Sequence, residues 1–197
     1  MSHIQEEIHR IQAEIPASTR LVAVAKYHPI EALPKDIEWH FIGHLQTNKI
    51  KYMAPYVALI HGVDSYKLLA EINKQAAKVG RTIPCLLQIH IAQEETKFGF
   101  SMDECRAMLA EGAWKELKHV QIVGVMGMGT NTDDAAQTEL EFASLQAFFH
   151  EVKQAHFADN THFCEISMGM SDDYPIAIRH GSTLIRVGSR IFGERVY

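Results

Sequence analysis

The sequence is poor in cysteine and lacks the short motifs that mark metal or dinucleotide sites. Its three cysteines, Cys85, Cys105 and Cys164, are far apart, and no CxxC pair or HExxH motif occurs. His40 and His44 are four residues apart, but on a strand and its loop this spacing does not bring two rings to one metal ion. We therefore expect no metal site, and three reduced cysteines in the core of a cytoplasmic protein.

Long apolar runs and runs of like charge are also absent. The net charge is −5 over 197 residues, which argues against a broad nucleic-acid or anionic-membrane surface. No segment reaches membrane-spanning length, and the opening "MSHIQEEIHRIQAEIP" predicts an amphipathic helix rather than a signal peptide. With 47% hydrophobic residues, the chain suits a single domain over residues 1–197. As a separate expectation, we take it to be a monomer or weak dimer whose partner is a small molecule.

Apolar segments alternate with helical segments along the whole chain. The helical segments carry caps, such as Ser65 before the first turn and Gly80 after the last turn of one of them. This alternation predicts a parallel α/β domain, either an open sheet or a (β/α)8 TIM barrel. Seven strands are visible, one fewer than a barrel needs, at residues 21–25, 38–43, 57–63, 85–91, 120–126, 163–166 and 183–188.

The interval after the first strand is too short for a normal crossover. Eleven residues, "YHPIEALPKDI", separate Lys26 from Glu38, and they include Pro29 and Pro34. A parallel crossover needs a helix, which these residues cannot supply. Either the two strands are joined irregularly, or one βα segment is missing after the first strand. An eighth strand at this point would complete the barrel.

The strand ends carry the candidate site. In a barrel the functional face lies at the carboxyl ends of the strands, where "LVAVA" runs into Lys26. "SMGMS" and "GSRIFG" follow the last two strands, and both combine glycine with serine before a helix start, as in phosphate sites. The last barrel strand lies beside the first, so a lysine near a phosphate cradle suggests a Schiff base with pyridoxal phosphate. The alternative interpretation is a rim lysine and glycines that only permit tight turns. "GVMGMGT" (124–130) does not match GxGxxG, and it predicts a loop at the barrel mouth.

Four segments carry a resemblance to a known family. "LVAVAKYHP", "IEWHFIGHLQTNK", "EISMGMSDDYPIAI" and "GSTLIRVGSRIFGER" resemble the pyridoxal phosphate homeostasis proteins, single-domain relatives of the alanine racemase N-terminal barrel. The resemblance spans nearly the whole chain and implies pyridoxal 5'-phosphate as cofactor. The cofactor-site residues that it implies are Lys26, His44, Asn48, Ser167, Met168, Arg186, Gly188 and Ser189.

The resemblance also implies a role for most of these residues. Lys26 would hold the cofactor as an internal aldimine, and Ser167 with its neighbouring backbone, together with the loop at Gly188, would bind the phosphate. Arg186 would face the pyridine nitrogen and keep it unprotonated, which makes the ring a poorer electron sink. His44 and Asn48 are placed at the pocket rim, with turn residues as the alternative interpretation.

This sequence departs from the family pattern in the short interval after Lys26. Family members have a helix and a second strand there, ending in a motif similar to Gly-Glu-Asn-Tyr, and none of it is present. Its asparagine is expected near the cofactor, so one pocket wall is affected. An engineered deletion, a natural deletion and a segment lost from the recorded sequence all remain open. We favour the last, because a real deletion leaves unpaired strand edges.

The function expected from the resemblance is intracellular carriage or buffering of pyridoxal phosphate. Racemases of this fold need a second acid/base tyrosine from another subunit's β-domain, and this chain ends at Tyr197, so we expect no robust catalytic activity. The alternative is a weak, racemase-like pyridoxal phosphate enzyme acting on small amino acids. A third possibility is a phosphate-binding barrel enzyme that uses Lys26 as an ordinary base.

Overall fold

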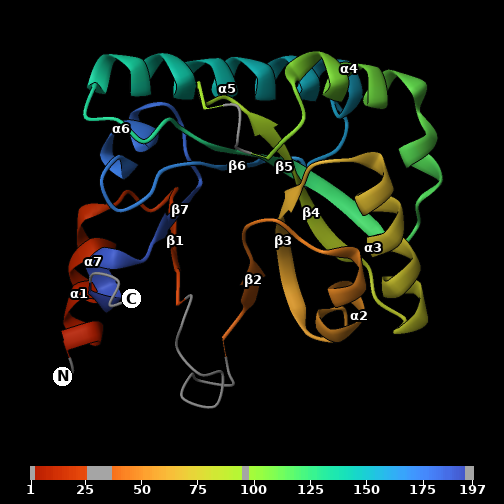
Figure 1. The fold of residues 1–197 in the computed structure, drawn as a ribbon, viewed down its shortest axis with the longest axis horizontal. Helices are drawn as coiled ribbons and strands as arrows, with labels where there is room; N and C mark the ends of the chain where they lie inside the picture. Colours follow the sequence, from red (N-terminus) through yellow and green to blue (C-terminus); the bar gives the residue numbers. More distant parts are fainter. Residues whose placement is uncertain (1–2, 26–36, 95–97, 194–197) are drawn as a thin grey trace.

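Seven parallel strands form one sheet in the order β1-β7-β6-β5-β4-β3-β2 (Figure 1). The computed structural model describes residues 3–25, 37–94 and 98–193. Each visible strand of the sequence is present, with ends shifted by a few residues. The strands are β1 (Arg20–Ala23), β2 (Trp39–Phe41), β3 (Val57–Val63), β4 (Ile83–His90), β5 (Val120–Met128), β6 (Glu165–Ser167) and β7 (Leu184–Val187).

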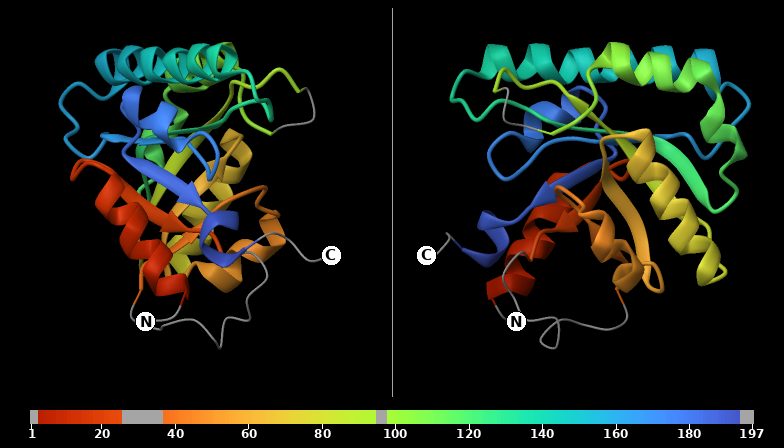
Figure 2. Two further views of the ribbon diagram at one scale, coloured as in Figure 1. Left: turned by 90° about the vertical axis from the view of Figure 1, so that its left-hand side faces the viewer. Right: turned by 45° about the vertical axis from the view of Figure 1, so that its right-hand side comes forward.

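The sheet curls into a nearly closed barrel. The last strand, β7, pairs in parallel with the first, β1, as expected for a barrel. Strand β2 pairs with β3, so β1 and β2 are the two edge strands of the described sheet. Because the sheet curls, these two edges lie opposite each other with a gap between them (Figures 1 and 2). The fold is a TIM-type barrel in which the position between these two strands holds no described strand. Residues 26–36, the interval in which we expect a segment to be missing, lie outside the described residues.

Helices cover the outside of the barrel (Figure 2). The expected caps are present: the Ser65 hydroxyl accepts a hydrogen bond from the backbone N–H of Leu68, and Ser101 with Glu104 forms a reciprocal capping box. Within the described ranges, no helix is long and apolar enough to cross a membrane. The helices are α1 (His3–Glu14), α2 (Ile50–Met53), α3 (Tyr66–Lys78), α4 (Met102–Glu111), α5 (Ala135–His156), α6 (Tyr174–Arg179) and α7 (Ser189–Phe192), with 3-10 turns η2 (Thr47–Lys49) and η3 (Ala113–Glu116).

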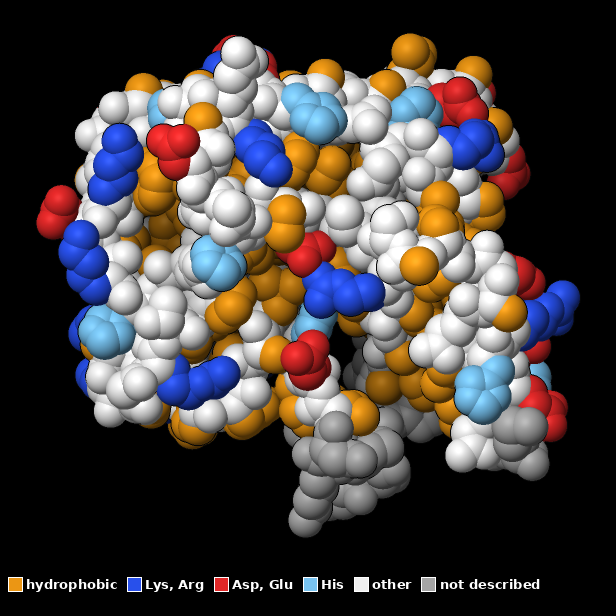
Figure 3. All heavy atoms as spheres, turned by 180° about the vertical axis from the view of Figure 1, so that it is seen from behind, with side chains coloured by type: hydrophobic (Ala, Val, Ile, Leu, Met, Phe, Trp, Pro, Cys, Tyr) orange, Lys and Arg blue, Asp and Glu red, His pale blue; other side chains and the backbone are white. Residues whose placement is uncertain are grey.

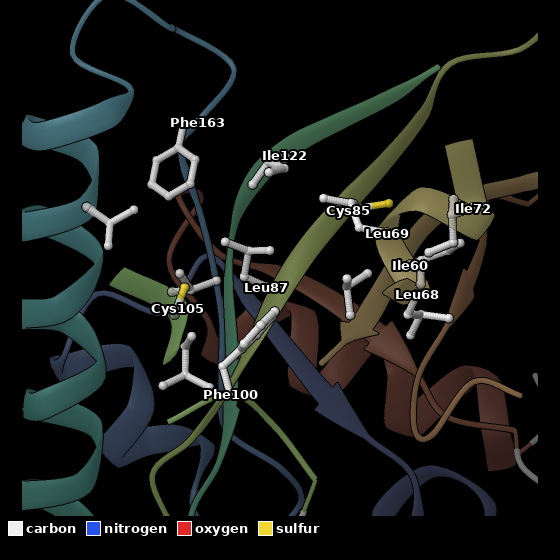
Figure 4. Packing of buried hydrophobic residues seen from close by; sticks show 14 of the residues in the cluster. Ile60, Leu68, Leu69, Ile72, Cys85, Leu87, Phe100, Cys105, Ile122 and Phe163 are labelled. Carbon is white, nitrogen blue, oxygen red and sulfur yellow. The ribbon is translucent and has the colours of Figure 1, made fainter. Parts of the chain in front are cut away.

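The side chains of successive residues in a strand pack into two different hydrophobic cores, one outside and one inside the barrel. The outer core fills the space between strands and helices and includes Ile60, Leu87 and Phe163 (Figure 4). The inner core fills the barrel and includes Leu59 and Leu86. Because side chains alternate along a strand, the neighbours of the outer-core residues point into the barrel. This burial of both faces explains why the strands read as continuous apolar runs.

Two expectations about local structure are wrong. Cys85 and Cys105 are buried as expected, but Cys164 is exposed because it precedes the short strand β6 and lies outside both cores. "GVMGMGT" does not form a loop throughout, because β5 continues to Met128. Gly124 lies within this strand, where a Cβ atom would be 1.8 Å from the backbone oxygen of Glu165 on β6. That glycine permits close approach of two strands.

Candidate functional site

A chain of polar side chains crosses the interior of the barrel. It links Arg186 on β7, Ser167 on β6, His61 on β3 and His40 on β2 through consecutive contacts of 2.8 to 3.0 Å. Arg186, Ser167 and His61 are almost completely buried, and His40 is half-buried. Parallel strands bring these residues together because their inward-facing positions meet inside the barrel.

Arg186 is a buried cation without a counter-ion in the described ranges. One guanidinium nitrogen donates to the Ser167 hydroxyl at 2.8 Å and another donates to the backbone oxygen of Gly127 at 3.0 Å. Burial lowers the pKa of Arg186 to about 10, against the opposing influence of Asp173, so the side chain remains charged at neutral pH. Burying an unpaired charge is costly, and a bound acceptor or anion would offset that cost. The guanidinium is therefore a candidate centre for a ligand site.

The two histidines are neutral in the same pH range. Nε2 of His61 lies 3.0 Å from Nδ1 of His40, and Nδ1 of His61 lies 2.9 Å from the Ser167 hydroxyl. Burial and then the charge of Arg186 hold the pKa of His61 well below 6.5. Burial also lowers the pKa of His40. Each neutral ring has one donor and one acceptor nitrogen. The hydrogen bonds that link Ser167, His61 and His40 therefore run in one of two directions, which the position of the His61 proton sets.

Gln88 supplies an unused acceptor in the barrel. Its Nε2 donates to the backbone oxygen of Phe98 at 3.0 Å, which fixes the orientation of the amide. Its Oε1 is buried and has no hydrogen-bond partner among the described residues. Gln88 lies two residues after the inner-core residue Leu86 on β4, so both side chains point to the same, inward face. The interior therefore holds an unpaired cation and an unpaired acceptor, which suits a small polar ligand.

The other expected phosphate-site residues follow β6 and β7 directly: Met168 comes after β6, and Gly188 and Ser189 come after β7. Met168 is fully buried in the outer core, and its backbone N–H donates to Leu184. The N–H of Gly188 lies 3.4 Å from the Ser171 hydroxyl, and Ser189 is exposed. A Cβ atom on Gly188 would be 3.2 Å from the backbone oxygen of Val24, so this loop lies directly against the end of β1.

His44 and Asn48 lie together at a different place. Both line an open hollow of about 410 Å³ beside the carboxyl ends of β2 and β3, together with Asp64 and Lys67. His44 is 3.4 Å from the Asp64 carboxylate and stacks on the ring of Phe98. No member of the Arg186–Ser167 chain lines this hollow. The structure thus brings the expected rim residues together but does not join them to the buried chain.

Lys26 lies outside the described residues. The described part of its segment ends at Ala25, and the backbone N–H of Val24 donates to Val187 at 2.8 Å. Val24, near the end of the described segment, therefore lies beside the end of β7, next to the loop at Gly188.

Sequence reasoning missed His61, His40 and Gln88 as members of the site. The available signal was a lone polar residue inside an apolar strand, as in "VALIHGV" and "CLLQIHI". Such a residue is rarely buried without a partner, so it marks an inward-facing polar layer.

A parallel barrel surrounded by helices, with buried polar groups inside it, defines the class as a β/α barrel. The sequence matches the family described as "Alanine racemase, N-terminal domain" over residues 5–196. It is 37% identical over 170 residues to the pyridoxal phosphate homeostasis protein of Helicobacter pylori, covering 86% of this chain and 72% of that protein. The chain therefore belongs to the alanine racemase N-terminal domain family, among the pyridoxal phosphate homeostasis proteins.

A solved structure and a longer relative support the same assignment. PipY of Synechococcus elongatus, solved with PLP bound, is 30% identical with a TM-score of 0.84, covering 96% of this chain and 100% of that one. The pyridoxal phosphate homeostasis protein of Vibrio alginolyticus is 29% identical over 238 aligned positions that span all of both chains. That alignment has 41 more positions than the 197 residues of this chain, so the relative contains residues without a counterpart here.

Proposed function

We propose that this protein binds pyridoxal 5'-phosphate inside the barrel and acts as a carrier or buffer of this cofactor. The observation that carries the proposal is the buried guanidinium of Arg186, whose hydrogen bonds within the described ranges go to Ser167 and Gly127 rather than to a carboxylate. A pyridine nitrogen is an acceptor of suitable size and polarity for that guanidinium. Membership of the family adds independent support.

The residues present fit the cofactor's polar groups. Arg186 would donate to the ring nitrogen, while Ser167 and the Gly188–Ser189 loop would hold the phosphate; the backbone N–H and carbonyl of Met168 are already bonded to Leu184 and Ser182. His44 and Asn48 would form the outer rim. The unpaired Oε1 of Gln88 offers a further acceptor inside the barrel. Because Arg186 is already oriented by Ser167 and Gly127, little side-chain entropy is lost when a ligand binds.

Lys26 is the proposed covalent attachment residue. The bound cofactor supplies an aldehyde that combines reversibly with an amine. Lys26 follows β1 in the sequence, and the described end of that segment lies against Gly188. Attachment at Lys26 would bring the amine to the same end of the barrel as the proposed phosphate loop. The resident arginine keeps the ring nitrogen unprotonated, which favours holding the cofactor over catalysis with it.

A binding titration tests the proposal. Ligand-free protein is titrated with pyridoxal phosphate and, separately, with pyridoxal, and binding is followed by absorbance. We expect saturable binding of one pyridoxal phosphate, and binding of pyridoxal weaker by at least about tenfold, the worth of one charge-assisted hydrogen bond. Equal affinity for the two compounds would contradict a phosphate-binding site. Absence of saturable binding would overturn the proposal as a whole.

A transfer assay tests the carrier role. The loaded protein is mixed with an apo form of a pyridoxal phosphate enzyme, in the presence of a phosphatase that destroys free cofactor. Recovery of enzyme activity under these conditions is the result expected of a carrier. Recovery only when the phosphatase is omitted would reduce the role to passive binding.

We also propose that residues 1–197 form one cofactor-binding domain that works in the cytoplasm as a monomer or weak dimer, without nucleic acid. Cys85, Cys105 and Cys164 are unpaired, which is typical of a reducing compartment. Sedimentation of the purified protein at several concentrations and fractionation of cells test these two points. A stable dimer at low concentration, or recovery outside the cytoplasmic fraction, would contradict them.

A further inference from the structure

The hydrogen-bond chain inside the barrel can run in two directions. Arg186 only donates, so the Ser167 oxygen accepts one hydrogen bond from it in either case. The hydroxyl proton of Ser167 can then point to Nδ1 of His61 or away from it. If it points to Nδ1, His61 carries its own proton on Nε2 and donates to His40. If His61 carries the proton on Nδ1, it donates to Ser167, and the serine proton is released for another acceptor.

His40 decides between these directions when it becomes charged. A protonated imidazole has donors on both nitrogens, so Nδ1 of charged His40 must donate to Nε2 of His61. His61 then carries its proton on Nδ1 and donates to Ser167. The hydroxyl of Ser167 consequently turns its proton toward the interior, where the proposed ligand lies.

We propose that His61 and His40 are positioning residues that control the direction of the Ser167 hydroxyl, and that protonation of His40 turns this hydroxyl toward the bound ligand. The inference rests on the proposed function and deepens it by assigning a pH-dependent regulation to the same site. By linkage, a ligand that accepts from Ser167 favours the charged form of His40, and acid in turn favours the ligand.

The surroundings of His40 allow it to titrate, whereas those of His61 do not. His40 is half-buried on the edge strand β2, and among the described residues its charged neighbours are Glu38 on its own segment, Arg20 on β1 and Glu165 on β6. Arg20 and Glu165 are paired with each other. His61 is fully buried and faces Arg186, His40 and Arg20. Figure 3, which views the molecule from behind Figure 1, shows basic, acidic and histidine side chains gathered beside a hollow near the middle of that face.

The pKa directions agree with this division of roles. Burial lowers the pKa of His40, with Glu38 and Glu165 opposing and Arg20 adding to the effect. The change in direction is therefore expected below about pH 6.5, the ordinary value for histidine. The pKa of His61 lies well below 6.5, so this ring moves its proton between nitrogens without gaining a second one.

The first test measures the direction in the ligand-free protein. Nitrogen-15 NMR of the imidazole rings reports which nitrogen of each histidine carries a proton. In the wild type, His61 should carry it on Nε2 at about pH 8 and on Nδ1 once His40 is charged. In His40→Asn the amide still reaches His61 but cannot titrate, so the acid-driven change should vanish. A His61 proton that stays on one nitrogen while His40 titrates would overturn the inference.

The second test measures its effect on the ligand. The dissociation constant of pyridoxal phosphate is compared between wild type, His40→Asn and the control His162→Asn, whose histidine is exposed on the surface. The dissociation constant of His40→Asn divided by that of the wild type should rise by about fivefold from about pH 8 to below pH 6. That change corresponds to the free energy of about one hydrogen bond. A ratio that stays constant with pH contradicts the ligand-facing role. Failure of the wild type to bind overturns the proposed function and that role together, while the NMR result decides the direction by itself.

Discussion

The guanidinium of Arg186 donates to the hydroxyl of Ser167 at 2.8 Å, across two adjacent strands and inside the barrel. Neither residue has a carboxylate partner among the described residues. The contact orients a buried positive charge before any ligand arrives. Such preorganisation lowers the cost of binding an acceptor.

Replacement of this cation should separate binding from stability. In Arg186→Met, loss of two hydrogen bonds is offset by removal of a desolvated charge, so we expect the unfolding free energy to change by less than about 1 kcal/mol. Binding of pyridoxal phosphate should weaken by more than about tenfold. Arg179→Met, which removes an exposed arginine paired with Glu139, is the matched control for binding. Unchanged affinity in Arg186→Met would contradict the proposed ligand contact.

The loop after β7 should be sensitive to bulk more than to a hydroxyl. Ser189→Ala removes one exposed hydroxyl and should weaken cofactor retention by about 1 kcal/mol. Gly188→Val should do more, because its Cβ would be 3.2 Å from the backbone oxygen of Val24 and its branches would block approach of a phosphate. Retention is measured by dialysis of loaded protein. Equal retention in both variants indicates a phosphate site elsewhere.

Stability should fall in acid because of the buried His61. Burial, with the charges of Arg186, His40 and Arg20, places its folded pKa well below 6.5. The unfolded chain therefore binds this proton more readily than the folded one. The stabilising contribution is complete above about pH 6.5 and is lost below it, by up to about 1.4 kcal/mol for each pH unit. Urea unfolding of wild type and His61→Asn between about pH 8 and pH 5 checks this, since the variant should show a smaller loss in acid.

Gly124 should tolerate no side chain. Its Cβ would be 1.8 Å from the backbone oxygen of Glu165, so Gly124→Ala must separate β5 from β6. We expect destabilisation of at least about 2 kcal/mol in urea unfolding. Gly80→Ala is the control, because Gly80 also has positive φ (+64°) but a methyl group there would meet nothing within 4 Å, and it should lose only about 1 kcal/mol. Similar losses in the two variants would mean that strand approach is not the cause.

The elements of the fold could be predicted because their signals are local. Ser65 caps α3, Ser101 with Glu104 forms the capping box of α4, and the apolar strand runs match barrel strands. The absence of an eighth strand after the first could also be predicted, since the eleven residues after Lys26 cannot form a crossover helix. In the described sheet, β1 and β2 accordingly remain unpaired with each other.

The buried polar chain could not be predicted from the sequence alone. His61 contacts His40 at a separation of 21 residues and Ser167 at a separation of 106, so the contacts depend on how the barrel closes. A single histidine in an apolar strand does not reveal its partners. Cys164 illustrates the same limit, because its exposure depends on where β6 begins.

Reduction of the loaded protein with borohydride, followed by peptide mass mapping, tests the cofactor-binding claim most directly. Borohydride converts a reversible lysine adduct into a stable amine that survives digestion. We expect the cofactor on Lys26 and its loss in Lys26→Ala, while Lys67→Ala, which removes a lysine of the hollow beside His44, retains full labelling. Undiminished labelling of Lys26→Ala, or a cofactor attached to Lys67, would contradict a site at the end of β1 inside the barrel.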